Sequence, residues 1–288
     1  MKSVLRDGTV IETYDGEGKA IEFLYSNALG RKVLAVLISP FVSYTAGFFL
    51  DRGISSCLVA PFIRKNNLDL SDYPERRYRS FNDFFTRKII PGRRPVDEDR
   101  THLISPCDGK LTVFRLSEDR KFKIKGCEYT LKTLLKSEEL SERYRGGWGI
   151  LLRLTVDDYH RYIYPVSGSK TGNRRIPGVY HTVNPRAAEA RQIYQENTRE
   201  YTIIRSDEFG SVLMMEIGAM LVGRISNHHA ECSVERGQEK GNFEFGGSSV
   251  ILLTEAGKFK PDADIADNSE KGLETVIKQG ECIGRICE

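Results

Sequence analysis

The hydrophobic and polar positions divide the chain into an early helical part and a longer part made of short strands. Residues 33–50 form an apolar run of 18 residues, with Pro40 and Gly47 inside it. A membrane-spanning helix needs about 20 mostly apolar residues, and a proline inside a helix removes a backbone donor. The pattern therefore predicts two short helices that are broken at Pro40.

The exposed side of these helices has two interpretations that the sequence leaves open. They can form a helical hairpin that packs on the protein core, or an apolar surface that lies in the interface of a membrane. Basic residues flank the run and are suited to contact lipid headgroups: Arg31, Lys32, Arg52, Arg64 and Lys65.

Another short helix is predicted directly after Ser80. Serine is a favoured N-cap, and Asp83 follows three residues later, as in a weak capping box. Pro91 and Gly92 would end the helix. Three aromatic residues share one helical face and are expected to point into the core: Phe81, Phe84 and Phe85.

From about residue 103 onward, short apolar runs alternate with turns rich in Gly, Asp and Asn. The clearest predicted strands are 110–114, 149–156, 212–217, 221–226 and 249–254, with helix-favouring stretches at 130–145 and 185–195. Residues 1–20 are polar and fit a short strand pair or a loose arm. We therefore expect an α+β protein that is mainly β, with an N-terminal helical region (1–100) and a β-rich domain (101–288).

Two segments of the β-rich part resemble each other. Residues 234–241 and 276–284 each place two glycines four positions apart after an apolar residue. Paired hairpins with such glycine turns are typical of the barrel-sandwich fold of biotinyl and lipoyl carriers. We expect a fold of that kind in the β-rich domain.

Composition and charge exclude several classes of function. Lys and Arg number 43 and Asp and Glu number 40, so the net charge of +3 is too small to indicate nucleic-acid binding. It is compatible with an anionic membrane surface. The six cysteines form no CxxC pair, which argues for reduced thiols and no metal site. The polar start lacks the apolar segment of a signal peptide, so we expect the protein in the cytoplasm.

The segment with the most chemistry is Gly246-Gly247-Ser248-Ser249, directly before an apolar run. Glycine has no Cβ, so this backbone can adopt conformations that are closed to other residues. The hydroxyl of Ser248 could then attack the carbonyl of Gly247 and convert the amide into an ester. Elimination would cut the chain and leave a pyruvoyl group, given a base and oxyanion donors. Alone, the pattern is more typical of an ordinary glycine turn that enters a strand.

Six ordered blocks give this segment its context. They are Ser80–Lys88 with Pro91–Pro95, Ser105–Lys110, Asp158–Arg161, His181–Pro185, Glu216–Ala219 with Val222-Gly223, and Phe243–Ser249. Together these blocks resemble the phosphatidylserine decarboxylase family, and the resemblance runs from about Ser80 to Glu288.

The resemblance implies a proenzyme that cuts itself between Gly247 and Ser248. It would give a large β chain, 1–247, that stays associated with a small α chain, 248–288. Ser248 would become a covalent pyruvoyl cofactor that forms a Schiff base with phosphatidylserine and releases CO2 and phosphatidylethanolamine. Asp108 and His160 would support cutting and catalysis. The protein would lie peripherally on the cytoplasmic side of the cell membrane, and a homodimer is left open.

One departure from the family pattern leaves the base for Ser248 open. Many members carry a second histidine three residues after the first, and this chain has Ile163 there. His181 is a candidate either to replace it or to line the site. Gly246 and Arg161 are further candidates for the site, with Arg161 suited to bind a phosphate or a carboxylate.

Three other functions compete with this interpretation. A serine hydrolase could use Ser248, His160 and Asp108, although the chain lacks the Gly-x-Ser-x-Gly elbow. A noncatalytic carrier-like or lipid-binding module would need no cut. A decarboxylase for another serine-headed lipid would share the chemistry but not the substrate.

Overall fold

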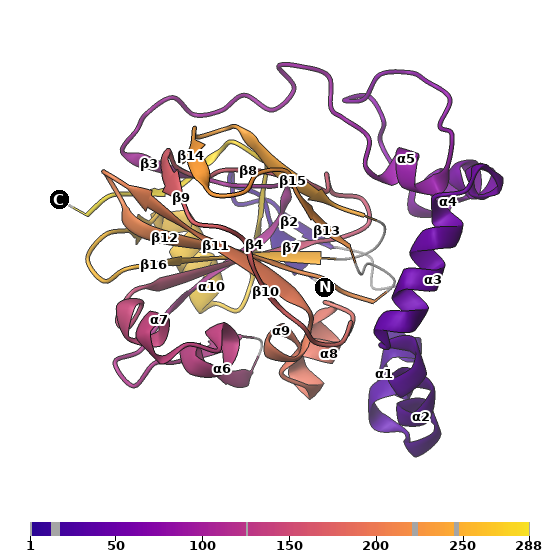
Figure 1. Cartoon of the computed structure of the whole chain (residues 1–288), viewed down its shortest axis with the longest axis horizontal. Helices are drawn as coiled ribbons and strands as arrows, with labels where there is room; N and C mark the ends of the chain where they lie inside the picture. Colours follow the sequence, from indigo (N-terminus) through magenta and orange to yellow (C-terminus); the bar gives the residue numbers. More distant parts are fainter. Residues whose placement is uncertain (1, 13–17, 125, 221–223, 245–247, 288) are drawn as a thin grey trace.

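The protein was analysed as a computed structural model that describes residues 2–12, 18–124, 126–220, 224–244 and 248–287. The N-terminal part begins with a hairpin and continues as a series of short helices that stand beside the β-rich core (Figure 1). Its elements are β1 (Lys2–Val4), β2 (Val10–Glu12), α1 (Gly18–Ser26), α2 (Ala28–Leu37), α3 (Pro40–Leu50), η1 (Gly53–Leu58), α4 (Val59–Asn66) and α5 (Phe81–Phe85).

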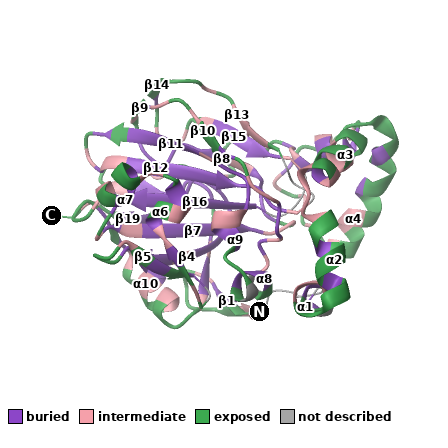
Figure 2. Ribbon diagram, turned by 60° about the horizontal axis from the view of Figure 1, so that its bottom comes forward, coloured by how far each residue is buried: buried purple, intermediate pink, exposed green. Residues whose placement is uncertain are grey.

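The predicted break at Pro40 is confirmed. Ser39 has the extended backbone of an N-cap and Pro40 is the first residue of α3, where the missing N–H costs nothing. The axes of α2 and α3 differ by 56°. Helices α2 to α4 are largely green, that is exposed, in Figure 2. Large apolar residues of α1, α2, α3 and η1 are among the exposed ones.

The helix after Ser80 also forms, but it ends at Phe85 and not at Pro91 as expected. The Asp83 N–H donates to Ser80 Oγ at 3.1 Å, which caps the start of α5. The three phenylalanines of this helix are buried and pack with Leu50 and Val59 into one small cluster. This cluster attaches the exposed helices to the rest of the protein.

The β-rich part is organised around one 11-stranded sheet. Its strand order is β14-β9-β11-β12-β16-β7-β4-β18-β1-β2, with β10 paired to β11. All of these pairs are antiparallel except β1 with β18. The elements are β3 (His102–Ile104), β4 (Gly109–Arg115), β5 (Lys121–Ile124), β6 (Cys127–Thr130), α6 (Leu131–Leu135), α7 (Glu138–Arg143), β7 (Trp148–Leu154), β8 (Arg161–Ile163), β9 (Gly168–Lys170), β10 (Arg174–Ile176), α8 (Pro185–Ala190), α9 (Ile193–Glu196), β11 (Arg199–Ser206), β12 (Gly210–Ile217), β13 (Ile225–Asn227), β14 (Cys232–Val234), β15 (Glu239–Phe243), β16 (Ser248–Thr254), β17 (Lys260–Pro261), α10 (Ala263–Glu270), β18 (Glu274–Ile277) and β19 (Cys282–Arg285).

The expectation of a mixed protein with mainly strands is confirmed, at 32% strand and 28% helix. The described strands form an open main sheet and three small sheets rather than a closed barrel, so the barrel-sandwich arrangement stays a prediction. Strands β1 and β2 belong to the main sheet, so the region expected to be helical also supplies its edge. The boundary at residue 100 stays a prediction.

Two local predictions need correction or restriction. The stretch 130–145 is two helices, because Lys136 adopts a left-handed backbone (φ 52°) and Ser137 caps a new start. In the stretch 221–226 the described strand, β13, begins at Ile225, and residues 221–223 lie outside the described residues.

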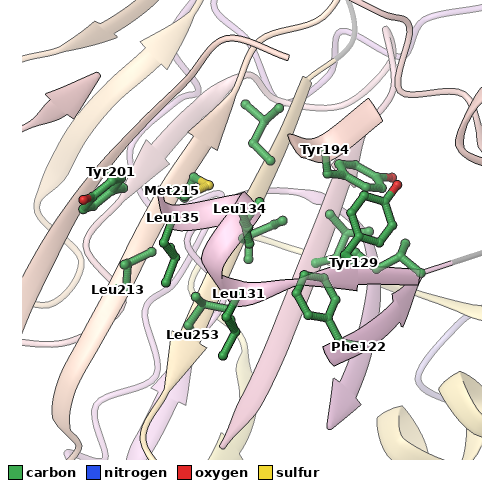
Figure 3. Packing of buried hydrophobic residues seen from close by; sticks show 14 of the residues in the cluster. Phe122, Tyr129, Leu131, Leu134, Leu135, Tyr194, Tyr201, Leu213, Met215 and Leu253 are labelled. Atoms are coloured by element: carbon green, nitrogen blue, oxygen red, sulfur yellow. The ribbon is translucent and has the colours of Figure 1, made fainter. Parts of the chain in front are cut away.

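The central strands are buried on both faces. Along β12 and β16 the odd-numbered residues, such as Met215 and Leu253, pack under α6 and α9 (Figure 3). The even-numbered residues, such as Met214 and Val250, face a second cluster that includes Tyr162 and Phe243. Side chains alternate between the two faces of a strand, so the register of β16 decides which cluster each serine at its start will face.

Candidate active site

One end of the main sheet brings the expected site residues to the same edge. Ser248 is the first residue of β16 and pairs with Leu154, the last residue of β7. On the other side of β7, the pairing of Lys110 with Arg153 places Gly109 beside Leu154. Neighbouring strands lie about 4.8 Å apart, so Ser248 and Gly109 are about 10 Å apart across β7. Asp108 precedes Gly109, and the turn after β7 leads to His160.

The hydroxyl of Ser248 is buried and has no hydrogen-bond partner among the described residues. Its even position in β16 places it on the face of Tyr162 and Phe243, while the buried hydroxyl of Ser249 takes the opposite face. A buried polar group without a partner is costly, and such groups concentrate at functional sites. Gly246 and Gly247, on the other side of the expected cut, lie outside the described residues.

His160 is held close to the strand that leads to Ser248. Its backbone carbonyl accepts from the N–H of Phe243, the last residue of β15, at 2.9 Å. The imidazole is buried against the ring of Phe85, with 4.2 Å between ring centroids. The backbone of His160 is therefore held by β15 and its ring by α5.

The hydrogen bonds of His160 define its protonation. Nδ1 lies 2.9 Å from the backbone oxygen of Asp158, which can only accept, so Nδ1 carries the hydrogen. In a neutral imidazole, Nε2 then keeps a free lone pair, and this nitrogen is buried with no partner in the described part of the chain. Burial lowers the pKa of His160 to about 4, against the raising influence of Asp158. At neutral pH this histidine is an uncharged base.

A buried ion pair shapes the turn that presents His160. Lys110 Nζ lies 2.7 Å from Asp158 Oδ2 and 2.6 Å from Thr155 Oγ1. The same Asp158 oxygen accepts from the Thr155 N–H at 2.7 Å. These bonds fix the backbone of residues 155–158 and thus the carbonyl that orients the imidazole.

The carboxylate of Asp108 is buried and is bound by two other segments. Arg94 donates to both of its oxygens, from Nε at 2.9 Å and from Nη2 at 2.8 Å, and the Gln279 N–H donates to Oδ1 at 2.8 Å. The Nδ1 partner of His160 is the Asp158 carbonyl and not this carboxylate. The structure therefore brings Asp108 to the same edge of the sheet, where it joins residues 94 and 279.

The other two predicted side chains are engaged in contacts of their own. His181 Nδ1 lies 2.9 Å from Tyr25 Oη of α1. Its Nε2 is 3.0 Å from Glu196 Oε2, an ion-pair distance without the alignment of a hydrogen bond. Arg161 donates from Nε and Nη2 to the Thr86 carbonyl, at 2.9 and 2.8 Å, and from Nη1 to Glu239. Neither side chain is free to act as a base or to hold a further anion without breaking these contacts.

One described group of side chains has the composition of a metal site. Donor atoms of Asp97, His102 and Cys282 all lie within 4.8 Å of one another. His102 Nδ1 contacts Asp97 at 3.1 Å and Cys282 Sγ contacts Asp262 at 3.8 Å, so the donors already have partners. Burial raises the pKa of Cys282 to about 11, which disfavours the thiolate that binds metals.

Comparison with known proteins identifies the relatives of the chain. The sequence profile of the family described as phosphatidylserine decarboxylase matches residues 81–285. A phosphatidylserine decarboxylase proenzyme 2 of Clostridium acetobutylicum is 43% identical over 92% of this chain and 91% of its own length. Phosphatidylserine decarboxylase proenzymes of Desulfitobacterium hafniense and Fusobacterium nucleatum are 40% and 38% identical, over 95% and 93% of this chain and 94% and 91% of theirs.

The chain belongs to the phosphatidylserine decarboxylase family. The matched range begins at the first residue of α5 and includes the whole edge that carries Ser248, Asp108 and His160. The exposed helices α1–α4 precede this range, although the matches to single relatives extend over more than nine tenths of the chain.

The structure shows what occupies the position of the expected second histidine. Ile163 ends β8, its side chain is buried, and its N–H donates to the Pro106 carbonyl at 2.8 Å. An apolar residue there cannot transfer a proton. Among the described histidines, His160 is buried at this edge with an unpartnered ring nitrogen, so it is the best candidate for the base.

Sequence reasoning missed a buried ion pair on the same face as Ser248. Glu216 Oε2 lies 2.9 Å from Lys240 Nζ, and both side chains are fully buried. Glu216 pairs across the sheet with Val250 and therefore points to the same face as Val250. Ser248 lies two residues before Val250 in the same strand, so the side chains of Glu216 and Ser248 share this face. A charged residue in the otherwise apolar run 212–217 was the available signal. Only the fold could show that Lys240 is its partner.

Proposed function

We propose that this chain cuts its own backbone between Gly247 and Ser248 and decarboxylates phosphatidylserine to phosphatidylethanolamine. The pyruvoyl group for this reaction would come from Ser248. Family membership supports the reaction. The observation that carries the site is a pair of complementary buried atoms at one edge of the sheet. Among the residues that the structure describes, the Ser248 hydroxyl has no acceptor and His160 Nε2 has no donor.

The cut follows from the chemistry of these two groups. Ser248 Oγ attacks the carbonyl carbon of Gly247 while its proton passes to His160 Nε2. The peptide C–N bond breaks as the proton is returned to the nitrogen, which leaves an ester and a free amine. Loss of the Cα proton of Ser248 then expels the carboxylate of Gly247 and divides the chain. Water finally hydrolyses the dehydroalanine left at position 248, so that its nitrogen leaves as ammonia and a pyruvoyl group remains.

The residues around Ser248 fit the pyruvoyl group that this sequence of steps would produce. Such a group supplies a carbonyl that condenses with the substrate amine and accepts the electrons released when CO2 leaves. The neutral imidazole of His160, fixed by Phe243 and Phe85, can then hold and return a proton near this carbonyl. The contacts of Asp108 support a positioning role, because its carboxylate joins the Arg94 side chain to the backbone of Gln279.

The sheet topology supports lasting association of the two chains after the cut. The small chain, 248–288, would contribute β16 and β18 to the main sheet. Strand β16 lies between β12 and β7, and β18 lies between β4 and β1, all four from the large chain. The small chain could leave only if the hydrogen bonds of β16 and of β18 to the strands on both of their sides were broken.

The protein is expected to release CO2 from phosphatidylserine vesicles and to form phosphatidylethanolamine. A carbonyl reagent such as hydroxylamine should stop the reaction, because it blocks the pyruvoyl carbonyl. Mass spectrometry of the lipids before and after the reagent measures both effects. Full activity after complete reaction with hydroxylamine would exclude a pyruvoyl mechanism.

Access to a lipid substrate is proposed through the N-terminal helices, with the protein lying peripherally on the cytoplasmic side of the membrane. Among the described residues, no single helix is long and apolar enough to cross a bilayer, but the bent pair α2 and α3 passes that test together. Large apolar side chains of this region are exposed: Leu29, Val36, Phe41, Phe48, Phe49 and Ile54. Such a surface favours burial in the interface of a membrane.

Replacing Phe41 and Phe48 together by serine should weaken binding to phosphatidylserine vesicles by about 100-fold or more, since each buried phenylalanine contributes about 1.5–3 kcal/mol. The two residues are 74% and 62% exposed and lie on one face of α3. Val10→Ser is the matched control, because Val10 is 54% exposed in β2, outside these helices. Vesicle sedimentation measures the effect, and equal loss in both variants would contradict the proposed surface.

A further inference from the structure

The guanidinium of Arg87 is buried without a carboxylate. Its side chain is 4% exposed and lies between the rings of Tyr73 and Phe84, with Cζ 4.1 and 4.5 Å from their centroids. Nη1 donates to the Phe84 carbonyl at 3.1 Å, and Nε is buried with no partner. No described carboxylate forms an ion pair with this arginine. Its charge and part of its donor fork are unsatisfied.

The two other buried arginines of the described chain are fully engaged, which makes Arg87 the exception. Arg153 binds both carboxylate oxygens of Glu274, at 3.1 and 2.5 Å. Arg199 donates from all three nitrogens to four backbone carbonyls, at 2.8–3.1 Å. A buried cation without compensation is strongly unfavourable, and an anion that binds at Arg87 would compensate it.

Three successive contacts fix Arg87 beside the candidate base. The ring of Tyr73, under the guanidinium, lies 6.1 Å from the ring of Tyr159. The ring of Phe85 lies 4.2 Å from the ring of His160. The carbonyl of Thr86 accepts two hydrogen bonds from Arg161. The segment that carries Arg87 is thus joined to residues 159, 160 and 161 in turn.

We propose that Arg87 binds the phosphate diester of the lipid headgroup and so places the headgroup amine at the Ser248 site. This inference rests on the proposed function. The planar guanidinium matches two oxygens of a phosphate. Phe84, which contacts Arg87, also belongs to the cluster that holds the exposed helices. The order of these elements matches the order of groups in the substrate. The exposed helices would contact the acyl chains, Arg87 the phosphate, and the site of His160 the amine.

The carboxylate of the substrate is the less suitable partner for Arg87. This group loses its negative charge as CO2 leaves, so a cation that held it would stabilise the ground state more than the transition state. The phosphate keeps its charge throughout the reaction. Binding at the phosphate therefore positions the substrate without opposing the chemistry.

The test measures inhibition of the processed enzyme by two soluble compounds that each carry one anionic group. Glycerophosphoglycerol has a phosphate diester and no carboxylate, and 3-hydroxypropionate has a carboxylate and no phosphate. In Arg87→Met the inhibition constant for glycerophosphoglycerol should rise about 10- to 100-fold, as expected for the loss of charge-assisted hydrogen bonds. The constant for 3-hydroxypropionate should stay within about twofold.

The control is Arg115→Met, because Arg115 also stacks on an aromatic ring, Trp148, but lies on the exposed side of β4. It should change neither constant. If Arg87→Met does not accumulate as two soluble chains, Arg87→Lys decides by the same two constants, since it keeps the charge and loses the fork. A rise for 3-hydroxypropionate alone, or no change for either compound, would overturn the proposal. An unmodified protein that never cuts itself would instead overturn the proposed function.

Discussion

Ser248→Ala is expected to remain a single chain of 288 residues and to have no decarboxylase activity. The substitution removes the hydroxyl that attacks Gly247 and forms the ester, so neither the cut nor the pyruvoyl group can arise. Activity should fall to the background of the assay rather than by a fixed factor. Denaturing electrophoresis and lipid analysis measure the two losses on the same preparation.

Ser249 provides the matched control for this experiment. Its hydroxyl is also buried and unpartnered, but it points to the opposite face of β16. Ser249→Ala should therefore still cut, with a change in folding stability as its main effect. Two chains from Ser248→Ala, or an uncut but stable Ser249→Ala, would show that the nucleophile has been placed on the wrong residue.

The second large effect is expected for His160→Gln, which should slow cutting by about 10²- to 10⁴-fold, the usual contribution of a general base. Glutamine fills much of the same volume beside Phe85 but cannot take up the proton of Ser248. The rate is measured as the appearance of the fragment 248–288 during synthesis in a cell-free system. Substrate turnover by any processed enzyme should fall as well, because the same nitrogen serves the later proton transfer.

His181→Gln separates this assignment from the alternative in which His181 replaces the missing second histidine. Both ring nitrogens of His181 contact other side chains, Tyr25 and Glu196, so its loss should affect the attachment of α1 more than the cut. Normal cutting by His160→Gln together with slow cutting by His181→Gln would reverse the roles that we assign.

The environment of His160 adds a pH dependence to the same prediction. Because burial lowers its pKa to about 4, the free base is present across the neutral range. Cutting should keep its rate from pH 7 to about 5 and fall near pH 4. An exposed histidine with an ordinary pKa would lose half its base near pH 6.5.

The same shift has a consequence for stability, with a defined sign. The folded state holds His160 neutral, so the unfolded state binds more protons between about pH 4 and pH 6.5. Stability therefore falls as the pH falls through this window, by up to about 3 kcal/mol from this group. Urea denaturation of the uncut Ser248→Ala protein at pH 7 and pH 5, with and without His160→Gln, measures this contribution.

Local chemistry made several features of this fold predictable. Pro40 ends one helix and begins the next because a proline is tolerated only at a helix start. Ser80 caps α5 with its side chain, and the spacing of Phe81, Phe84 and Phe85 places all three in the core. Such signals act within a few residues, so the sequence carries them directly.

Other features depend on partners far apart in the chain. The register that places Ser248 beside Leu154, and the contact of Asp108 with Arg94, depend on how distant segments meet. That Arg87 forms no ion pair with a described carboxylate can be recognised only from the fold, because the fold places the carboxylates around it. The break at Lys136 was missed for a local reason, since lysine gives no signal for a left-handed backbone.

The central claim is that Ser248 becomes a pyruvoyl group at a new chain end, and the intact mass of the denatured protein tests it most directly. The account predicts two chains, residues 1–247 and 248–288, with the smaller one carrying a pyruvoyl group in place of its first serine. Only the smaller chain should gain mass with a carbonyl reagent. A single chain of 32.7 kDa, or a 248–288 fragment that begins with unmodified serine and ignores the reagent, would contradict it.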